Sequence, residues 1–162
     1  MTSGPGAAGR PVVISEAIDP PGLARPSGFS HAVRSSGGLL VHLAGQTALD
    51  PAGRIVGTTI VEQFRQALGN LLTALEAAGG RPNHLVSMTI YLVDVDLYQA
   101  HGREVGAVWR DLVGNHWPAT AAVGVSRLWD RAAMVELQGV AVVPDVERPV
   151  PGGGRAHRPS PS

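Results

Sequence analysis

Cysteine and lysine are both missing from the 162-residue chain, and aromatic residues make up only 4% of it. Without thiols there can be no disulfide, no cysteine nucleophile and no thiolate metal site. All 13 cationic side chains are arginine, and they balance 13 acidic ones to a formal charge of zero. Nucleic-acid-binding domains usually carry a basic excess that releases counterions from phosphate. We therefore expect no nucleic-acid partner.

Long apolar runs are absent as well. No segment approaches the ~20 residues that a membrane-spanning helix needs, and residues 1–11 lack the basic and apolar regions of a signal peptide. The six histidines do not have the spacing of metal ligands, and neither a phosphate-binding glycine loop nor a GxSxG motif is present. We expect a cytoplasmic protein with no membrane partner and no metal site.

Composition separates the two ends of the chain from its middle. Residues 1–11 and 144–162 are rich in Pro, Gly and Ser and show no apolar periodicity, which predicts disordered tails. Residues 12–143 between them contain no repeat and no linker long enough to divide them. Since 44% of the chain is hydrophobic, these residues are predicted to form one domain with an aliphatic core.

Two alternating periodicities predict the elements of this domain. Period-two patterns indicate strands at residues 12–15, 29–34, 39–44, 85–93, 120–126 and 132–143, with a hairpin turn at 36–38. Capping boxes that begin at Thr59 and Asp96 precede two helical stripes. The order predicts an α+β sandwich in which two helices cover one face of a mixed sheet. Apolar residues on the other face need a cover, either a second copy of the chain or the loops at 19–28 and 50–58.

Glu136 is the most informative single residue. Strand parity places it with Met134 and Gln138 on one face of the last strand, opposite Val135 and Leu137. In an apolar cleft its pKa would rise, which suits a general acid or base near neutrality. A glutamate on a solvated strand face, or one paired with an arginine at an interface, is the commoner origin of such a pattern, and this alternative stays open.

Two further candidates come from neighbouring strands. Thr120, Ala122 and Gly124 share one face by parity, and three small side chains in line leave space for a ligand or for a closely packed neighbour. His31 lies in a predicted strand, where a hydrogen-bonded structural histidine is commoner than a catalytic one. It is a minor candidate for binding.

Several blocks of this sequence together resemble the reactive-intermediate deaminase family, Rid/YjgF. The resemblance covers residues 12–143 and rests on the stretches 44–51 (AGQTALDP), 62–71 (EQFRQALGNL), 75–80 (LEAAGG), 89–94 (TIYLVD), 117–120 (WPAT) and 135–142 (VELQGVAV). It implies a chorismate-mutase-like fold and a homotrimer with clefts at the subunit interfaces. It also implies hydrolysis of enamines or imines to a 2-keto acid and ammonia without any cofactor.

The sequence departs from the family pattern at the residues that would bind substrate. The resemblance gives Glu136 the role of positioning water, and Gly45 belongs to a matching block. Thr120, however, stands where the family has an arginine that clamps the substrate carboxylate, and Phe29 stands where it has a tyrosine. Gly102 replaces an asparagine near the cleft.

These departures lead to a specific hypothesis about function. The chain is interpreted as a divergent Rid-family enzyme that hydrolyses a small imine, enamine or similar intermediate lacking a free carboxylate, with Glu136 positioning water or shuttling a proton. The alternative is a homologue that binds a small molecule without turning it over, as a binding or regulatory protein. Ribonuclease activity has the weakest support, because the chain has no basic stripe and no paired catalytic histidines.

Overall fold

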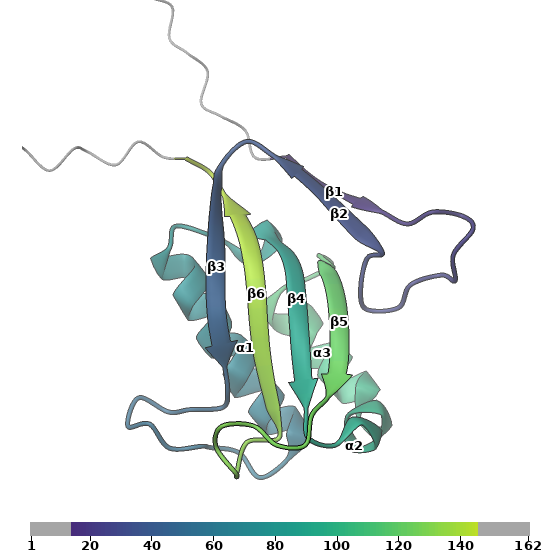
Figure 1. Ribbon diagram of the computed structural model, residues 1–162. Helices are drawn as coiled ribbons and strands as arrows, with labels where there is room; N and C mark the ends of the chain where they lie inside the picture. Colours follow the sequence, from purple (N-terminus) through teal and green to yellow (C-terminus); the bar gives the residue numbers. More distant parts are fainter. Residues whose placement is uncertain (1–13, 146–162) are drawn as a thin grey trace, which may run out of the picture.

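The computed structural model describes residues 14–145, which form a sheet covered on one side by helices (Figure 1). The main sheet has four strands in the order β3-β6-β4-β5, with β3 at Leu39–Gln46, β4 at Leu85–Leu92, β5 at Ala119–Gly124 and β6 at Val135–Val143. β6 runs antiparallel to β3 and β4, whereas β5 runs parallel to β4. The predicted α+β architecture with a mixed sheet is confirmed. The predicted tails lie almost entirely outside the described residues.

Helix α1 at Ile60–Ala77 forms as the sequence predicts. The Glu62 backbone N–H donates to Thr59 Oγ1 at 3.2 Å, and the Thr59 N–H donates to Glu62 Oε2 at 3.1 Å, which completes the capping box. Gly79, with φ +83°, ends the helix in the left-handed conformation that favours glycine. The buried stripe of α1 packs on the sheet and contains Ile60, Gln63, Phe64, Ala67, Leu68, Leu71 and Leu75.

The second predicted helix is two helices in the structure. Helix α2 at Val95–Ala100 is capped by Asp94, whose Oδ1 accepts from the Leu97 N–H at 2.8 Å. The predicted cap at Asp96 is therefore wrong, because this carboxylate lies in the first turn instead of preceding it. The chain bends at His101, and α3 continues over Gly102–Leu112. Three α-helices, not two, accompany the sheet in residues 14–145, in addition to a short 3-10 turn at Pro82–His84.

The N-terminal strands form a separate hairpin. β1 at Ile14–Ile18 pairs antiparallel with β2 at Ala32–Ser36, and this ribbon projects from the β5 side of the main sheet (Figure 1). The hairpin predicted around residues 36–38 is wrong, because β2 and β3 do not pair with each other: β2 pairs with β1, and β3 pairs with β6. Gly37 and Gly38, with φ +69° and +119°, turn the chain from one sheet into the other.

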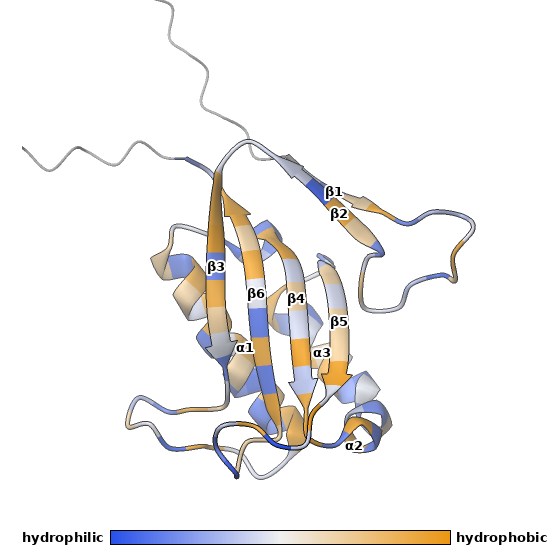
Figure 2. Cartoon of the chain, viewed as in Figure 1, coloured by the Kyte–Doolittle hydropathy of each residue, from blue (hydrophilic) through white to orange (hydrophobic). Residues whose placement is uncertain are grey.

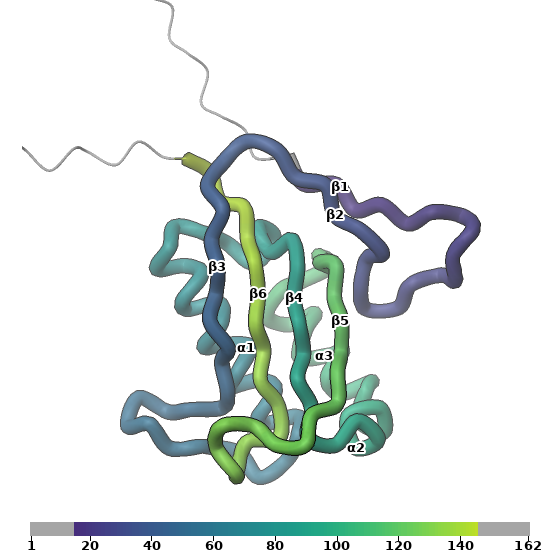
Figure 3. The backbone as a smooth tube through the Cα atoms, in the orientation of Figure 1, coloured from purple at the N-terminus to yellow at the C-terminus, as the bar shows by residue number. Residues whose placement is uncertain are grey.

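The two faces of the main sheet differ in burial. The helix-facing side carries Met88, Ile90, Val135, Leu137 and Ala141, all at most 5% exposed. The outer face alternates with it and shows hydrophilic bands on β6 (Figure 2). Leu40 and Val123 on this outer face are 61% and 41% exposed, and the loops after β1 and β3 run past the ends of the strands (Figure 3). The described loops therefore leave this face uncovered.

No helix within residues 14–145 combines the length and the apolarity needed to cross a bilayer. The same residues contain no group of three or more His, Cys, Asp and Glu side chains arranged to hold a metal ion.

Candidate functional site

Glu136 lies on the outer face of the sheet, against the backbone of Gly45. β6 presents the half-buried Glu136 between the fully buried Val135 and Leu137. Gly45 lies on the adjacent strand β3, at an irregularity of pairing between Leu43 and Gln46. A Cβ atom at Gly45 would lie 2.8 Å from Glu136 Cδ and closer still to Oε1. A residue with any side chain at position 45 would therefore displace the carboxylate.

Tyr91 is the cross-strand neighbour of Glu136. The β4–β6 register pairs these two residues directly, and the Tyr91 hydroxyl donates to Gln138 Oε1 at 2.8 Å. The Glu136 carboxylate itself makes no hydrogen bond or ion pair with another residue in the described range 14–145. Its oxygens are thus available to accept from water or a ligand. The sequence places Tyr91 in a half-buried strand, but it does not reveal the register that makes Tyr91 the cross-strand neighbour of Glu136.

Phe29, His31 and Thr120 meet at the β5 end of the sheet. They line a pocket of about 290 Å³ together with Ser87, Thr89 and Ala121, among others. The rings of Phe29 and His31 meet edge to face, with centroids 5.3 Å apart and planes at 83°. Three of the six predicted site residues therefore share one pocket.

Hydrogen bonds fix two of these side chains in place. His31 Nε2 lies 2.8 Å from the Ala24 carbonyl oxygen, within hydrogen-bonding distance. The His31 backbone N–H donates to Asp19 Oδ1 at 2.9 Å. Thr120 Oγ1 donates to the Pro118 carbonyl at 3.0 Å, so its hydroxyl proton is already used. These contacts suit residues that shape a pocket.

The predicted site residues do not come together within the single chain. Thr120 pairs with Met88 in the β4–β5 register, which points its side chain to the helix-facing side, whereas Glu136 pairs with Tyr91 on the outer side, the face that also carries Thr89 and Ala121 of the pocket. Gly102 begins α3, behind the sheet, and lines a different cavity. The six residues form three separate groups: Glu136 with Gly45, Phe29 with His31 and Thr120, and Gly102 alone.

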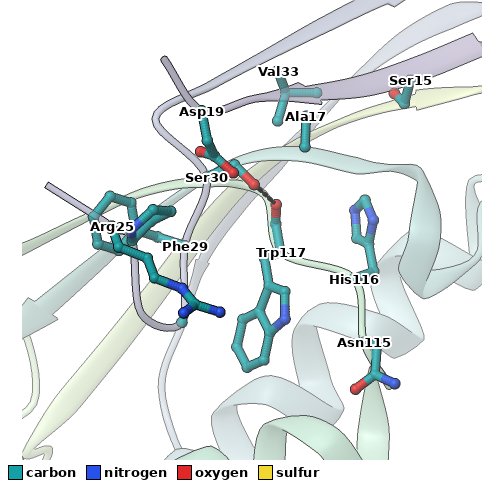
Figure 4. A pocket seen from close by; sticks show the side chains of 12 residues that line it. Ser15, Ala17, Asp19, Arg25, Phe29, Ser30, Val33, Asn115, His116 and Trp117 are labelled. Carbon is teal, nitrogen blue, oxygen red and sulfur yellow. Dashed lines mark hydrogen bonds between the residues drawn. The ribbon is translucent and has the colours of Figure 1, made fainter. Parts of the chain in front are cut away.

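A larger cavity of about 550 Å³ lies between the β1–β2 hairpin and the loop that precedes β5. Arg25, Trp117 and His116 are among the residues that line it (Figure 4), and Phe29 lines both this cavity and the smaller pocket. The Ser30 hydroxyl donates to the Trp117 carbonyl at 2.7 Å and fastens the hairpin to that loop. Arg25 is exposed, and nothing in its sequence context singled it out.

Comparisons with known proteins agree with the resemblance found in the sequence. The family model described as endoribonuclease L-PSP matches residues 22–143. A RutC family protein of Pyrococcus horikoshii is 33% identical over 130 residues, which cover 79% of this chain and 98% of that relative. A 2-iminobutanoate/2-iminopropanoate deaminase of Capra hircus is 33% identical over 103 residues, covering 63% of this chain and 72% of the relative.

Solved structures show the same relationship. The Rid-family protein YyfB of Yersinia pestis superimposes with a TM-score of 0.72 at 29% identity, over 80% of this chain and 98% of that one. Rv2704 of Mycobacterium tuberculosis, a member of the YjgF/YER057c/UK114 family, is 34% identical with a TM-score of 0.54, over 72% of this chain and 87% of that one. With a family model that matches most of its length, this chain belongs to the Rid/YjgF family.

Proposed function

We propose that the chain is a divergent Rid-family enzyme that hydrolyses a small imine or enamine lacking a free carboxylate, without a cofactor. The observation that carries the proposal is the Glu136 carboxylate, which rests on Gly45 with its oxygens unused by other described residues. A carboxylate held in this way can accept a proton from water as the water attacks. The deaminase names of several relatives support chemistry at a carbon–nitrogen double bond.

The reaction needs only water and proton transfers. Water adds through its oxygen to the imine carbon while Glu136 takes one of its protons, and this gives a carbinolamine. Glu136 returns that proton to the nitrogen as the carbinolamine forms. The hydroxyl proton then passes to the nitrogen, the carbon–nitrogen bond breaks, and ammonia leaves as the carbonyl forms. An enamine first gains a proton on carbon and loses one from nitrogen, which makes it the imine. Imine and water are thereby converted to carbonyl compound and ammonia, with no redox partner.

The substrate class follows from the residue at position 120. A bidentate bond between arginine and a carboxylate contributes about 1.5–3 kcal/mol and fixes orientation. The resemblance puts Thr120 where the family has that arginine, and the Thr120 hydroxyl already donates to Pro118. Phe29 likewise supplies no hydroxyl to the same pocket. A neutral or esterified imine fits this pocket better than a 2-imino acid.

The complete site is proposed to form between copies of the chain in a homotrimer. In one protomer Glu136 and Thr120 occupy opposite faces of the sheet, and the outer face that carries Glu136 is uncovered by the described residues. A neighbouring copy packed on that face would cover Leu40 and Val123 and could bring a second pocket wall to Glu136.

The alternative is that the clefts bind a small molecule without turnover. The same substitutions at Thr120 and Phe29 favour it, because a site that has lost substrate-orienting groups can keep a ligand without accelerating its reaction. Stabilisation by a ligand without product formation would then be observed. The word endoribonuclease in the family description gains no support from a chain of zero net charge.

The test follows ammonia release from freshly generated 2-aminoacrylate and from its methyl ester. Wild type should act on the ester and only weakly on the acid. Thr120→Arg should gain activity on the acid, whereas the uncharged control Thr120→Gln should not. Arg25→Gln tests the nearby cation: if wild type acts well on the acid and this variant loses that activity, Arg25 is a carboxylate clamp and the proposed substrate class is wrong. Wild type inactive on both substrates would favour the binding alternative.

A further inference from the structure

A cavity of about 550 Å³ opens behind the sheet, between α2, α3 and the residues around Gly28. Its floor is the hydrophobic core itself: Phe64, Met88, Ile90, Val105 and Trp109 line it, each at most 5% exposed. Met88 and Ile90 face away from Tyr91 and Glu136, so the cavity lies on the opposite side of the sheet from the Glu136 carboxylate. We propose that this cavity is a second ligand site, which binds a small carboxylate with an aromatic body.

Two glycines on α3 keep the cavity open. Gly102 and Gly106 are four residues apart and therefore lie on the same side of the helix. A Cβ atom at Gly102 would meet nothing within 4 Å, and one at Gly106 would meet only the Arg110 side chain, with Nη1 at 3.4 Å. Glycine is unfavourable inside a helix, and packing against neighbours does not require it at either position. Larger side chains here would fill the space above the buried floor.

Aromatic rings form the wall of the cavity. Trp109 and Trp117 stack with centroids 5.6 Å apart and planes at 16°, and both line the space. The Trp109 indole N–H is already bonded to the His116 carbonyl at 2.9 Å, so this wall offers apolar surface. Tyr98 lies against Phe64, with centroids 6.1 Å apart, and both line the cavity. A planar ring fits between such surfaces.

The polar groups of the cavity favour an anion. Arg110 is the cation among its lining residues, and the lining includes no carboxylate. Arg110 forms no ion pair with another residue of the described range, whereas the adjacent Asp111 pairs with Arg65. Burial raises the pKa of Tyr98 to about 12, so its phenol stays protonated at neutral pH. The hydroxyl bonds no other described residue and can donate to a ligand oxygen.

Size and chemistry together define the ligand class. The volume lies within the range of roughly 300–1,000 Å³ that small-molecule sites occupy. The lining combines the apolar floor with polar side chains from Ser27, Tyr98, Gln99 and Arg110. An aryl carboxylate places its ring between the indoles and Tyr98, and its carboxylate near the Arg110 guanidinium at the mouth. This site does not depend on Glu136, and it goes beyond the proposed hydrolysis.

The test uses indole-3-acetate as the probe and its neutral amide, indole-3-acetamide, as the control ligand. Calorimetric titration of the full-length chain should show saturable binding of the acid in the micromolar to millimolar range. Gly106→Leu fills the cavity and should weaken binding at least about tenfold. Gly69→Leu, on α1 where an added Cβ meets nothing within 4 Å, is the matched control and should leave binding unchanged. Thermal unfolding of both variants checks that the fold is intact.

Arg110→Gln separates charge from shape. It should weaken binding of the acid about tenfold and leave the weaker binding of the amide unchanged. Arg103 is an exposed arginine on the same helix outside the cavity lining, and Arg103→Gln should change the affinity for neither ligand. Absence of saturable binding by wild type overturns the proposal. Binding that survives Gly106→Leu, or that is equally strong for acid and amide, overturns it as well. None of these outcomes depends on whether the chain hydrolyses imines.

Discussion

Replacing Gly45 by alanine tests whether the Glu136 carboxylate rests on the backbone of β3. The added Cβ would lie 2.8 Å from Glu136 Cδ and 3.2 Å from Cγ, whereas carbon atoms pack at about 3.5–4.0 Å. The carboxylate must therefore move by about 1 Å. Overpacking of this kind destabilises by about 1–3 kcal/mol, and we expect the low end because the end of the glutamate side chain is flexible and half-exposed.

A second effect opposes the first. Gly45 is not among the glycines with positive φ, so alanine suits its backbone. Alanine also lowers the conformational entropy of the unfolded chain, which raises the free energy of unfolding by about 0.4–1 kcal/mol. The net change in the free energy of unfolding is therefore close to zero. The informative quantity is the coupling between positions 45 and 136, because removing the Glu136 side chain removes the overlap but not the backbone effect.

Urea denaturation of wild type, Gly45→Ala, Glu136→Ala and the double variant measures this coupling. We expect Gly45→Ala to be more favourable by about 1 kcal/mol when Glu136 is absent. In the enzyme, a displacement of about 1 Å should also reduce kcat by up to about a hundredfold. A coupling below about 0.3 kcal/mol, the level at which independent sites add, would refute the contact between the two residues.

Three further predictions concern α1 and its contacts. Thr59→Ala removes the N-cap and should lower the free energy of unfolding by about 1 kcal/mol in denaturant titration. The backbone N–H groups of Thr58 and Thr59 hold the pKa of Glu62 below its ordinary value of 4.5. The Glu62 carboxylate therefore stabilises the fold above that pH, and this stabilisation is lost as the pH falls through the lower folded-state pKa. Glu62→Gln should make the free energy of unfolding less dependent on pH on the acid side. Gln63 is 2% exposed and bonds three backbone groups, so Gln63→Ala should cost about 3 kcal/mol by thermal or urea unfolding; a loss below about 1 kcal/mol would mean that water replaces these bonds.

The parts of the fold that depend on neighbouring residues were predictable from the sequence. Local sequence encodes the capping box at Thr59 and the stop at Gly79, and spacings of three and four residues encode the apolar stripe of α1. The second helical region was less so, because Asp94 and Asp96 offer similar local caps and only the fold decides that Asp94 is used. The pairing of β2 with β1 instead of β3 is a non-local outcome that a Gly-rich turn does not reveal.

The candidate site divides in the same way. Parity within β6 correctly separated Glu136 from Val135 and Leu137. Parity within β5 grouped Thr120 with Ala122 and Gly124, but it could not say that this group faces away from Glu136. That relation depends on the register of both strands with β4, which pairs Thr120 with Met88 and Glu136 with Tyr91. Arg25 was missed because a loop carries no periodicity that relates it to a cavity.

The most direct test of the proposed function is the rate of ammonia release from the methyl ester of 2-aminoacrylate by wild type and by Glu136→Gln. The variant keeps the shape of the side chain but cannot take a proton from water. We predict that wild type accelerates release and that the variant loses about a hundredfold or more of this acceleration, with unchanged thermal stability. An acceleration that is equal in both proteins would contradict a role for Glu136 in the chemistry.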